Sequence, residues 1–137
     1  MTTSNEDIQH ALNKHCSTFT ALTSVVYENI EYSPTIGIPY LRTWLLPGET
    51  FPLTLGPEGV MDYGGVFQID CCYPKGRGWK LAKDMAGKVC THFNRGTLIT
   101  YNNILVRIRR AWPGPAIIEE ELYRVPVSVL YECFDNS

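Results

Sequence analysis

The sequence predicts a domain of the α+β class, because two segments with helical spacing of apolar residues are separated by segments with strand-like alternation. The helical segments are 4–21 and 79–93, and the clearest alternation lies at 60–73. A chain of 137 residues suits one folding unit, so we expect a single domain spanning 1–137.

Each predicted helix has one apolar face and a recognisable end. In 4–21, Ser4 followed by Asp7 resembles a capping box. The helix at 79–93 is followed by Asn94-Arg95-Gly96, in which Gly96 can adopt the left-handed conformation of a helix end. The apolar faces are Ile8, Leu12, Cys16 and Phe19 in the first helix, and Leu81, Ala82, Met85, Ala86, Val89, Cys90 and Phe93 in the second.

Six segments are expected as strands, from their β-forming residues and their alternation: 24–30, 40–46, 60–73, 97–101, 104–112 and 122–134. Asn102-Asn103 indicates a hairpin turn between the fourth and fifth of these. Gly64-Gly65 predicts a bulge or kink, and Pro126 predicts an edge position or a bulge in the last strand. Gln68 and Asp70 share one strand face, which we expect to meet solvent or a partner.

The segment 47–59 contains three prolines and three glycines, and we expect Pro47-Gly48 to end the preceding strand. Inside the segment, Phe51, Leu53 and Leu55 alternate. The segment is interpreted as an exposed arm or an irregular edge strand, since proline cannot donate to a ladder. Its apolar residues either cover the domain's own core or reach a neighbouring subunit.

Composition excludes several classes of protein. The net charge of −2 and the pI of about 5.9 do not favour a general nucleic-acid binder. The N-terminus lacks the pattern of a secretory signal, and no apolar run approaches the ~20 residues of a membrane span. We therefore expect a soluble protein made in a cytoplasm. The five cysteines form no CxxC pair and are expected to be buried free thiols.

No constellation of residues typical of catalysis, metal binding or cofactor binding is found. His10 and His15 are spaced too unfavourably for a two-histidine metal site on one helix face. Gly76-Arg77-Gly78 precedes a helix but lacks the pattern of a phosphate loop. We therefore predict that the chain is not an enzyme and holds no metal or cofactor.

One basic cluster, consisting of Arg107, Arg109 and Arg110, lies in the strand at 104–112. It is either a solvated strand face or an electrostatic patch that faces nucleic acid or an acidic neighbour. The following segment, 113–121, is expected to be a loop. It carries the acidic run Glu119, Glu120 and Glu121, which could pair with the arginines within one chain or across a symmetric interface.

The order of these features resembles the family of small bacteriophage tail terminators and tail completion proteins. The resemblance covers nearly the whole chain and rests on the following residues: Tyr27-Glu28-Asn29, Pro39-Tyr40-Leu41-Arg42, Leu55-Gly56, Gly65-Val66-Phe67-Gln68-Ile69-Asp70, Tyr73-Pro74, the glycines of Pro74-x-Gly-x-Gly-x-x-x-Ala82, Phe93-x-x-Gly96-Thr97 and Pro126-Val127. These are positions that determine a fold, and they carry no catalytic signature.

The resemblance implies a mostly antiparallel (mixed) sheet with two helices packed on one face. It also implies a homo-oligomeric ring, typically a hexamer, which caps the head-proximal end of the tail tube, ends its polymerisation and provides the head-joining surface. The implied partners are other copies of the chain, the major tail tube protein and head–tail connector proteins, with no membrane, no specific nucleic acid and no cofactor. Such a protein belongs to the tail of the virion and is assembled in the bacterial host cytoplasm. The alternatives are another head–tail joining or tail-tube component of the same fold, or a small nucleic-acid-binding module.

Overall fold

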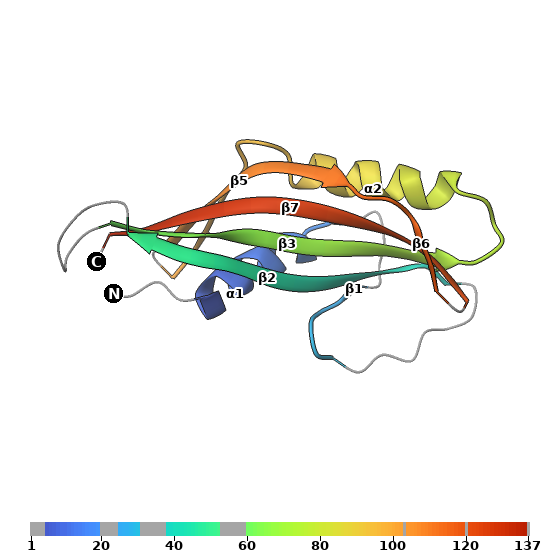
Figure 1. Cartoon of the computed structure of the whole chain (residues 1–137), viewed down its shortest axis with the longest axis horizontal. Coiled ribbons are helices and arrows are strands. Elements are labelled where there is room, and N and C mark those ends of the chain that lie inside the picture. The colour runs from blue at the N-terminus through green and yellow to red at the C-terminus, as the bar shows by residue number, and fades with distance from the viewer. Residues whose placement is uncertain are drawn as a thin grey trace.

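The protein is a single curled, seven-stranded sheet with two helices packed behind it, as Figure 1 shows. The computed structural model describes residues 5–19, 25–30, 38–52, 60–102, 104–119 and 121–136. Over these ranges, both helices bury side chains in the same apolar core as the inner face of the sheet. The predicted α+β class is therefore confirmed.

The strands are β1 (Val25–Val26), β2 (Tyr40–Pro52), β3 (Val60–Pro74), β4 (Leu98–Tyr101), β5 (Ile104–Pro113), β6 (Ile117–Glu119) and β7 (Leu122–Asn136). Their order across the sheet is β1-β2-β3-β7-β5-β4, and β6 pairs with β7 beyond the end of β5. The short β1 pairs with β2 in parallel, whereas all the other pairs are antiparallel. The sheet is thus mixed but mostly antiparallel, as expected.

The helices are α1 (Asn5–Ser17) and α2 (Lys80–His92). α1 ends four residues before the predicted 21, because Ser17 and Thr18 hydroxyls donate to the carbonyls of Lys14 and His15 and so satisfy the last turn. Fully buried core residues contribute about 1.5–3 kcal/mol each. They include Ile8 and Leu12 in α1, Val89 in α2, Phe67 and Ile69 in β3, Val106 and Ile108 in β5, and Val125, Val127 and Val129 in β7.

The expectation that Pro47-Gly48 ends a strand was wrong, because β2 continues to Pro52. The pairing of β2 with β3 shifts register here: Pro47 lies opposite Gly65, but Thr50 lies opposite Tyr63. One extra residue in β2 makes a bulge that lets the strand continue past the proline. The irregularity predicted at Gly64-Gly65 is therefore real, although the additional residue belongs to the partner strand.

Neighbouring atoms lie so close to residue 65 that it must be glycine. A Cβ at Gly65 would lie 2.6 Å from Tyr131 Oη, 2.7 Å from the Leu46 carbonyl oxygen and 2.8 Å from the Gly48 nitrogen. The bulge thus brings three strands so close together that only glycine fits at its centre.

Beyond Arg42, β2 forms an edge of the sheet, because β1 pairs with only Leu41 and Arg42. The Leu45 amide donates to Glu28 Oε1 at 2.8 Å, so this outward-facing donor is already occupied. Pro47, two residues on, faces the same way and has no amide hydrogen. The interpretation as an irregular edge strand is thus confirmed for the start of the 47–59 segment, and residues 53–59 lie outside the described residues.

The last strand departs most from expectation. Pro126 predicted an edge or a bulge, yet β7 is central and pairs with β3, β5 and β6. Pro126 lies where the neighbour of β7 changes from β5 to β6, and its carbonyl accepts the Gly114 amide at 2.7 Å. No ladder donor is needed at this gap, so proline is tolerated in a central strand.

Two further segments, 24–30 and 113–121, also differ from the predicted structure. The segment 24–30 forms only the two-residue β1, followed by a turn in which Asn29 has a φ of 61°. The expected loop at 113–121 contains the strand β6. Among the described residues, no helix is long and apolar enough to cross a membrane.

Candidate interaction surface

Most of the sheet face opposite the helices is not covered by any described helix or strand, and this face is rich in apolar side chains. Register partners on this face form rows across the strands. One row consists of Leu46, Val66, Leu130 and Arg110, and the next of Trp44, Gln68, Ser128 and Trp112. Monomeric proteins rarely leave such a face fully exposed, so it is a candidate surface for association.

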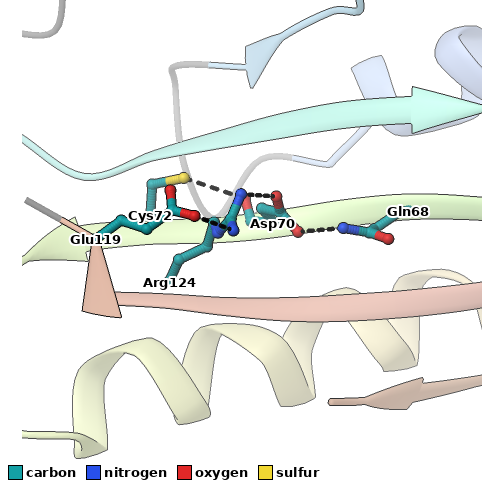
Figure 2. Close-up of polar contacts among 5 residues, drawn as sticks. All are labelled: Gln68, Asp70, Cys72, Glu119 and Arg124. Atoms are coloured by element: carbon teal, nitrogen blue, oxygen red, sulfur yellow. Dashed lines mark hydrogen bonds and ion pairs between the residues drawn. The ribbon is translucent and has the colours of Figure 1, made fainter. Parts of the chain in front are cut away.

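A buried polar cluster lies at one end of this open face, and Figure 2 shows its members. Asp70 in β3 accepts from Arg124 Nη1 at 3.1 Å and from Gln68 Nε2 at 2.9 Å. The Nη2 of Arg124 donates to Glu119 Oε1 at 2.9 Å. The cluster therefore links three strands, β3, β7 and β6, through one guanidinium group.

Burial determines the direction in which the pKa of Asp70 is shifted. Asp70 has no exposed surface. Desolvation raises the pKa of its carboxyl group, although hydrogen bonds from Gln68 and the positive charge of Arg124 act in the opposite direction. Arg124 Nε is buried and has no hydrogen-bond partner among the described residues. The arrangement holds strands together and offers no nucleophile or open ligand position.

The strand face that carries Gln68 and Asp70 was expected to meet solvent or a partner, but Asp70 itself is buried within the chain. Alternation correctly placed Gln68 and Asp70 on the face opposite the helices, but the side chain of Arg124 covers Asp70. Tyr40, Cys72 and Val26 form a small second core beside it on the same face. The open part of the sheet face thus begins beyond this cluster.

A second feature of the surface is an arginine pocket of about 560 Å³. We use this name for the pocket lined by Arg95, Gly96, Arg107, Ile108, Arg109, Arg110, Leu130 and Glu132. Arg95 follows α2, and the other three arginines lie on β5, where a register shift between Ile108 and Arg110 turns Arg109 outward beside Arg110. Four arginines and one glutamate therefore line a single concave site.

The ion pairs inside the pocket leave positive charge in excess. Arg107 Nε lies 2.9 Å from Glu132 Oε1, and Arg109 Nε lies 3.8 Å from Glu132 Oε2. Arg110 stacks on the Trp112 ring, with its guanidinium carbon 4.5 Å from the ring centroid. Neither Arg95 nor Arg110 forms an ion pair with any residue that the structure describes.

The structure brings together some of the predicted interface residues and separates others. Arg107, Arg109 and Arg110 share the pocket, whereas Glu119 pairs with Arg124 in a different cluster. Glu121 is exposed, and its carbonyl accepts the Lys75 amide at 2.9 Å. Glu120, Leu53 and Leu55 lie outside the described residues, and only the backbone of Phe51 is described, within β2.

Sequence reasoning missed Arg95 and Glu132 as members of the pocket. Glu132 lies opposite Arg107 on neighbouring strands, a register that sequence spacing alone does not give. Arg95 was interpreted only as part of a helix end. Its approach to β5 follows from the Gly96 amide donating to the Ile108 carbonyl at 2.9 Å.

Two of the histidines connect the helices. His15 and His92 stack with ring centroids 4.3 Å apart, and the Nε2 of each lies 2.8 Å from the carbonyl oxygen of the other. They thereby join the ends of α1 and α2. None of the five cysteines forms a disulfide; four of them are buried and Cys90 is half-buried. No group of three metal-ligating side chains occurs among the described residues.

Comparison with known proteins agrees with this surface-centred interpretation. A family model described as phage tail terminator protein matches residues 7–131. A solved structure whose title gives no function superposes with a TM-score of 0.76 at 25% identity, over 96% of both chains. A chain from a structure titled "Virion of native gene transfer agent (GTA) particle" superposes with a TM-score of 0.66 at 17% identity, over 98% of this chain and 100% of that one, which shows a shared fold.

No curated protein matches the chain. The family match nevertheless includes most or all of each strand of the sheet and of both helices, since it leaves out only the first residues of α1 and the last residues of β7. The chain belongs to the phage tail terminator protein family and has a structural role in a phage tail.

Proposed function

We propose that the protein assembles as a homo-oligomeric ring on the head-proximal end of the tail tube. The ring ends polymerisation of the tube and provides the surface that the head-joining proteins bind. The observation that carries this proposal is the family match over residues 7–131.

The geometry supports the proposal in two ways. The open sheet face exposes large apolar side chains that a partner would cover, including Leu46, Leu98 and Leu105. The outer edge of β2 is occupied by Glu28 and interrupted by Pro47. Uncontrolled edge-to-edge strand addition is thereby disfavoured, and association is directed to side-chain surfaces.

Purified tail tubes test the capping function directly. Tubes that elongate in the presence of free tube protein are expected to stop when this protein is added, with density at one end in negative-stain micrographs. Continued elongation at an unchanged rate would refute capping. The mass from light scattering, measured over a range of concentrations, reports the ring separately.

A second candidate is a tube-forming or head–tail joining subunit of the same fold. It is favoured by the structural match to a chain of a gene transfer agent particle, whose title names the whole particle and no single role. Microscopy of the purified protein separates the two candidates. A terminator gives discrete rings, and a tube subunit gives polymers of unlimited length.

A further inference from the structure

We infer that the arginine pocket of one copy binds the β6 turn of a second copy of this chain. By the β6 turn we mean Ile117, Ile118, Glu119 and Glu121, the described residues of β6 and of the turn into β7. The inference rests on the proposed function, because a ring is closed by contacts between two different patches on each subunit.

The pocket needs an anionic partner. Its four arginines face one glutamate, and that glutamate is already engaged by Arg107 and Arg109. Arginine is enriched at protein interfaces because its planar fork binds carboxylates in fixed geometry. Arg95 and Arg110 are left for an incoming carboxylate, since neither forms an ion pair with any described side chain.

Two exposed leucines lie beside Arg107 of the pocket. Leu98 lies opposite Arg107 on β4, and Leu105 lies two residues before Arg107 on the same face. Both leucines are about half exposed, at 59% and 49%. A partner that fits this site therefore carries aliphatic side chains beside its carboxylates.

The β6 turn has that composition. Ile118 is 61% exposed and Ile117 is 37% exposed, and they directly precede Glu119. All three side chains of this strand are exposed, so much of their apolar surface is left uncovered by their own domain. Two adjacent isoleucines in such a strand are the kind of apolar surface that a partner covers.

Two described residues of the turn are also held in place before binding. Glu119 is fixed by Arg124, which is itself anchored on the buried Asp70, and the Glu121 carbonyl is fixed by the Lys75 amide. A rigid segment loses less conformational freedom on binding, which favours a specific contact.

The two patches lie apart on one molecule. β6 is at the right-hand end of the view in Figure 1, whereas β5 begins well to the left. In one chain, Glu119 pairs with Arg124 and the pocket arginines pair with Glu132. The pocket and the turn therefore meet only between copies, head to tail.

Charge exchange gives a sharp test. Variant one, Arg109→Glu with Arg110→Glu, leaves two arginines against three glutamates in the pocket. Variant two, Ile117→Lys and Ile118→Lys with Glu121→Lys, changes the net charge of residues 117–121 from −3 to +1. Both change exposed side chains, so each is expected to fold with a circular dichroism spectrum and melting temperature near those of the wild type.

The expected result is that the wild type associates, and that each variant alone requires an at least roughly tenfold higher concentration to associate, because like charges then meet in every contact. An equimolar mixture of the two variants is expected to associate again, as every contact in an alternating ring is then complementary. The matched control, Lys83→Glu with Lys88→Glu on the exposed face of α2, makes the same change in charge elsewhere and is expected to associate as the wild type does.

Three results would overturn the inference. If each variant alone associates as the wild type does, the pocket and the turn do not meet, although a ring formed by other surfaces stands. If variant one associates normally but loses retention on a double-stranded DNA column at low salt, the pocket is a nucleic-acid site. If the wild type stays monomeric at every concentration, no second copy occupies the pocket, and the tube-end assay then decides the capping function separately.

Discussion

Arg124 and Asp70 form an ion pair across the junction of β7 and β3, with Nη1 and Oδ2 3.1 Å apart, and Asp70 is completely buried. The same guanidinium binds Glu119 at 2.9 Å. This chain of contacts connects the centre of the sheet to β6, the strand that we propose binds a neighbouring copy. If β6 binds a neighbouring copy as proposed, one side chain links folding to assembly.

Replacing Arg124 by Met is expected to destabilise the monomer by about 3 kcal/mol, because it leaves the Asp70 carboxylate buried without a positive partner. The measurement is the urea midpoint at neutral pH. The double change Arg124→Met with Asp70→Asn removes both charges and is expected to recover most of the loss. A double variant no more stable than Arg124→Met would show that the charge of Asp70 is not the cause.

Gly65→Ala is expected to destabilise the protein by about 1–3 kcal/mol, since the new Cβ would overlap Tyr131 Oη and two backbone atoms of β2. The melting temperature reports this effect. The matched control is Gly87→Ala, on the exposed side of α2, where nothing lies within 4 Å of a Cβ. That change is expected to stabilise the helix by about 0.5–1 kcal/mol. Equal effects of the two changes would contradict the close packing at the bulge.

We expect the folded protein to lose stability in mild acid because of the environment of His15. Burial, followed by the neighbouring charge of His92, lowers the pKa of His15 below its ordinary 6.5, although the hydrogen bond to His92 acts the other way. The unfolded chain then binds the proton more tightly, so the contribution of His15 is complete above pH 6.5 and is lost as the pH falls below it.

Urea midpoints of the wild type and of His15→Gln, taken between about pH 8 and pH 5, test this prediction. Glutamine can donate the same hydrogen bond but does not titrate in this range, so the variant should lose less stability in acid. His10→Gln, an exposed change on the same helix, is the control. Parallel curves for the wild type and His15→Gln would contradict the assignment. The difference between curves is needed because the raised pKa of Asp70 favours the folded state as the pH falls.

The burial of the cysteines leads us to expect a particular order of chemical labelling. Burial raises the pKa of Cys16 to about 12 and that of Cys72 to about 11, so almost no thiolate is present at neutral pH. We expect an alkylating reagent at about pH 8 to modify half-buried Cys90 first in the folded protein, and all five cysteines in urea. Peptide mass spectrometry measures the order. Labelling of Cys16 or Cys71 before Cys90 would contradict their burial.

Ile118→Asp is expected to weaken association by roughly tenfold in concentration while leaving the monomer's melting temperature unchanged, because Ile118 is exposed in a single chain and covered in the proposed contact. The control is Ile30→Asp, which changes a side chain of equal exposure in the turn after β1. Sedimentation of both variants reports the effect. Equal weakening by both changes would count against β6 as the contact.

The spacing of apolar residues predicted the helices and the long strands, because a helix or strand that packs on a core needs its apolar side chains on one face. The alternation in β7 places Val125, Val127 and Val129 on the core face, and the structure confirms this arrangement. A different signal failed at Pro47-Gly48, where the presence of proline and glycine predicted the end of the strand. Here a bulge and an edge position remove the need for the missing donor, and neither is a local property of the sequence.

The pocket could be predicted only in part. The three arginines of β5 were visible as a cluster in the sequence, and alternation placed Arg107 and Arg109 on one face. Arg110 joins them only through the register shift between Ile108 and Arg110. Their partner Glu132 depends on the register of β5 against β7, and Arg95 depends on the bond from Gly96 to β5. The strand β6 was missed because three exposed residues between prolines and acidic residues have no burial pattern to reveal them.

The most direct test of the central claim is the length of tail tubes grown with and without this protein, measured by negative-stain electron microscopy. The account predicts that added protein stops elongation and that a discrete ring is seen at one end of each tube. Tubes that keep growing, with bare ends or with the protein incorporated along their length, would contradict it.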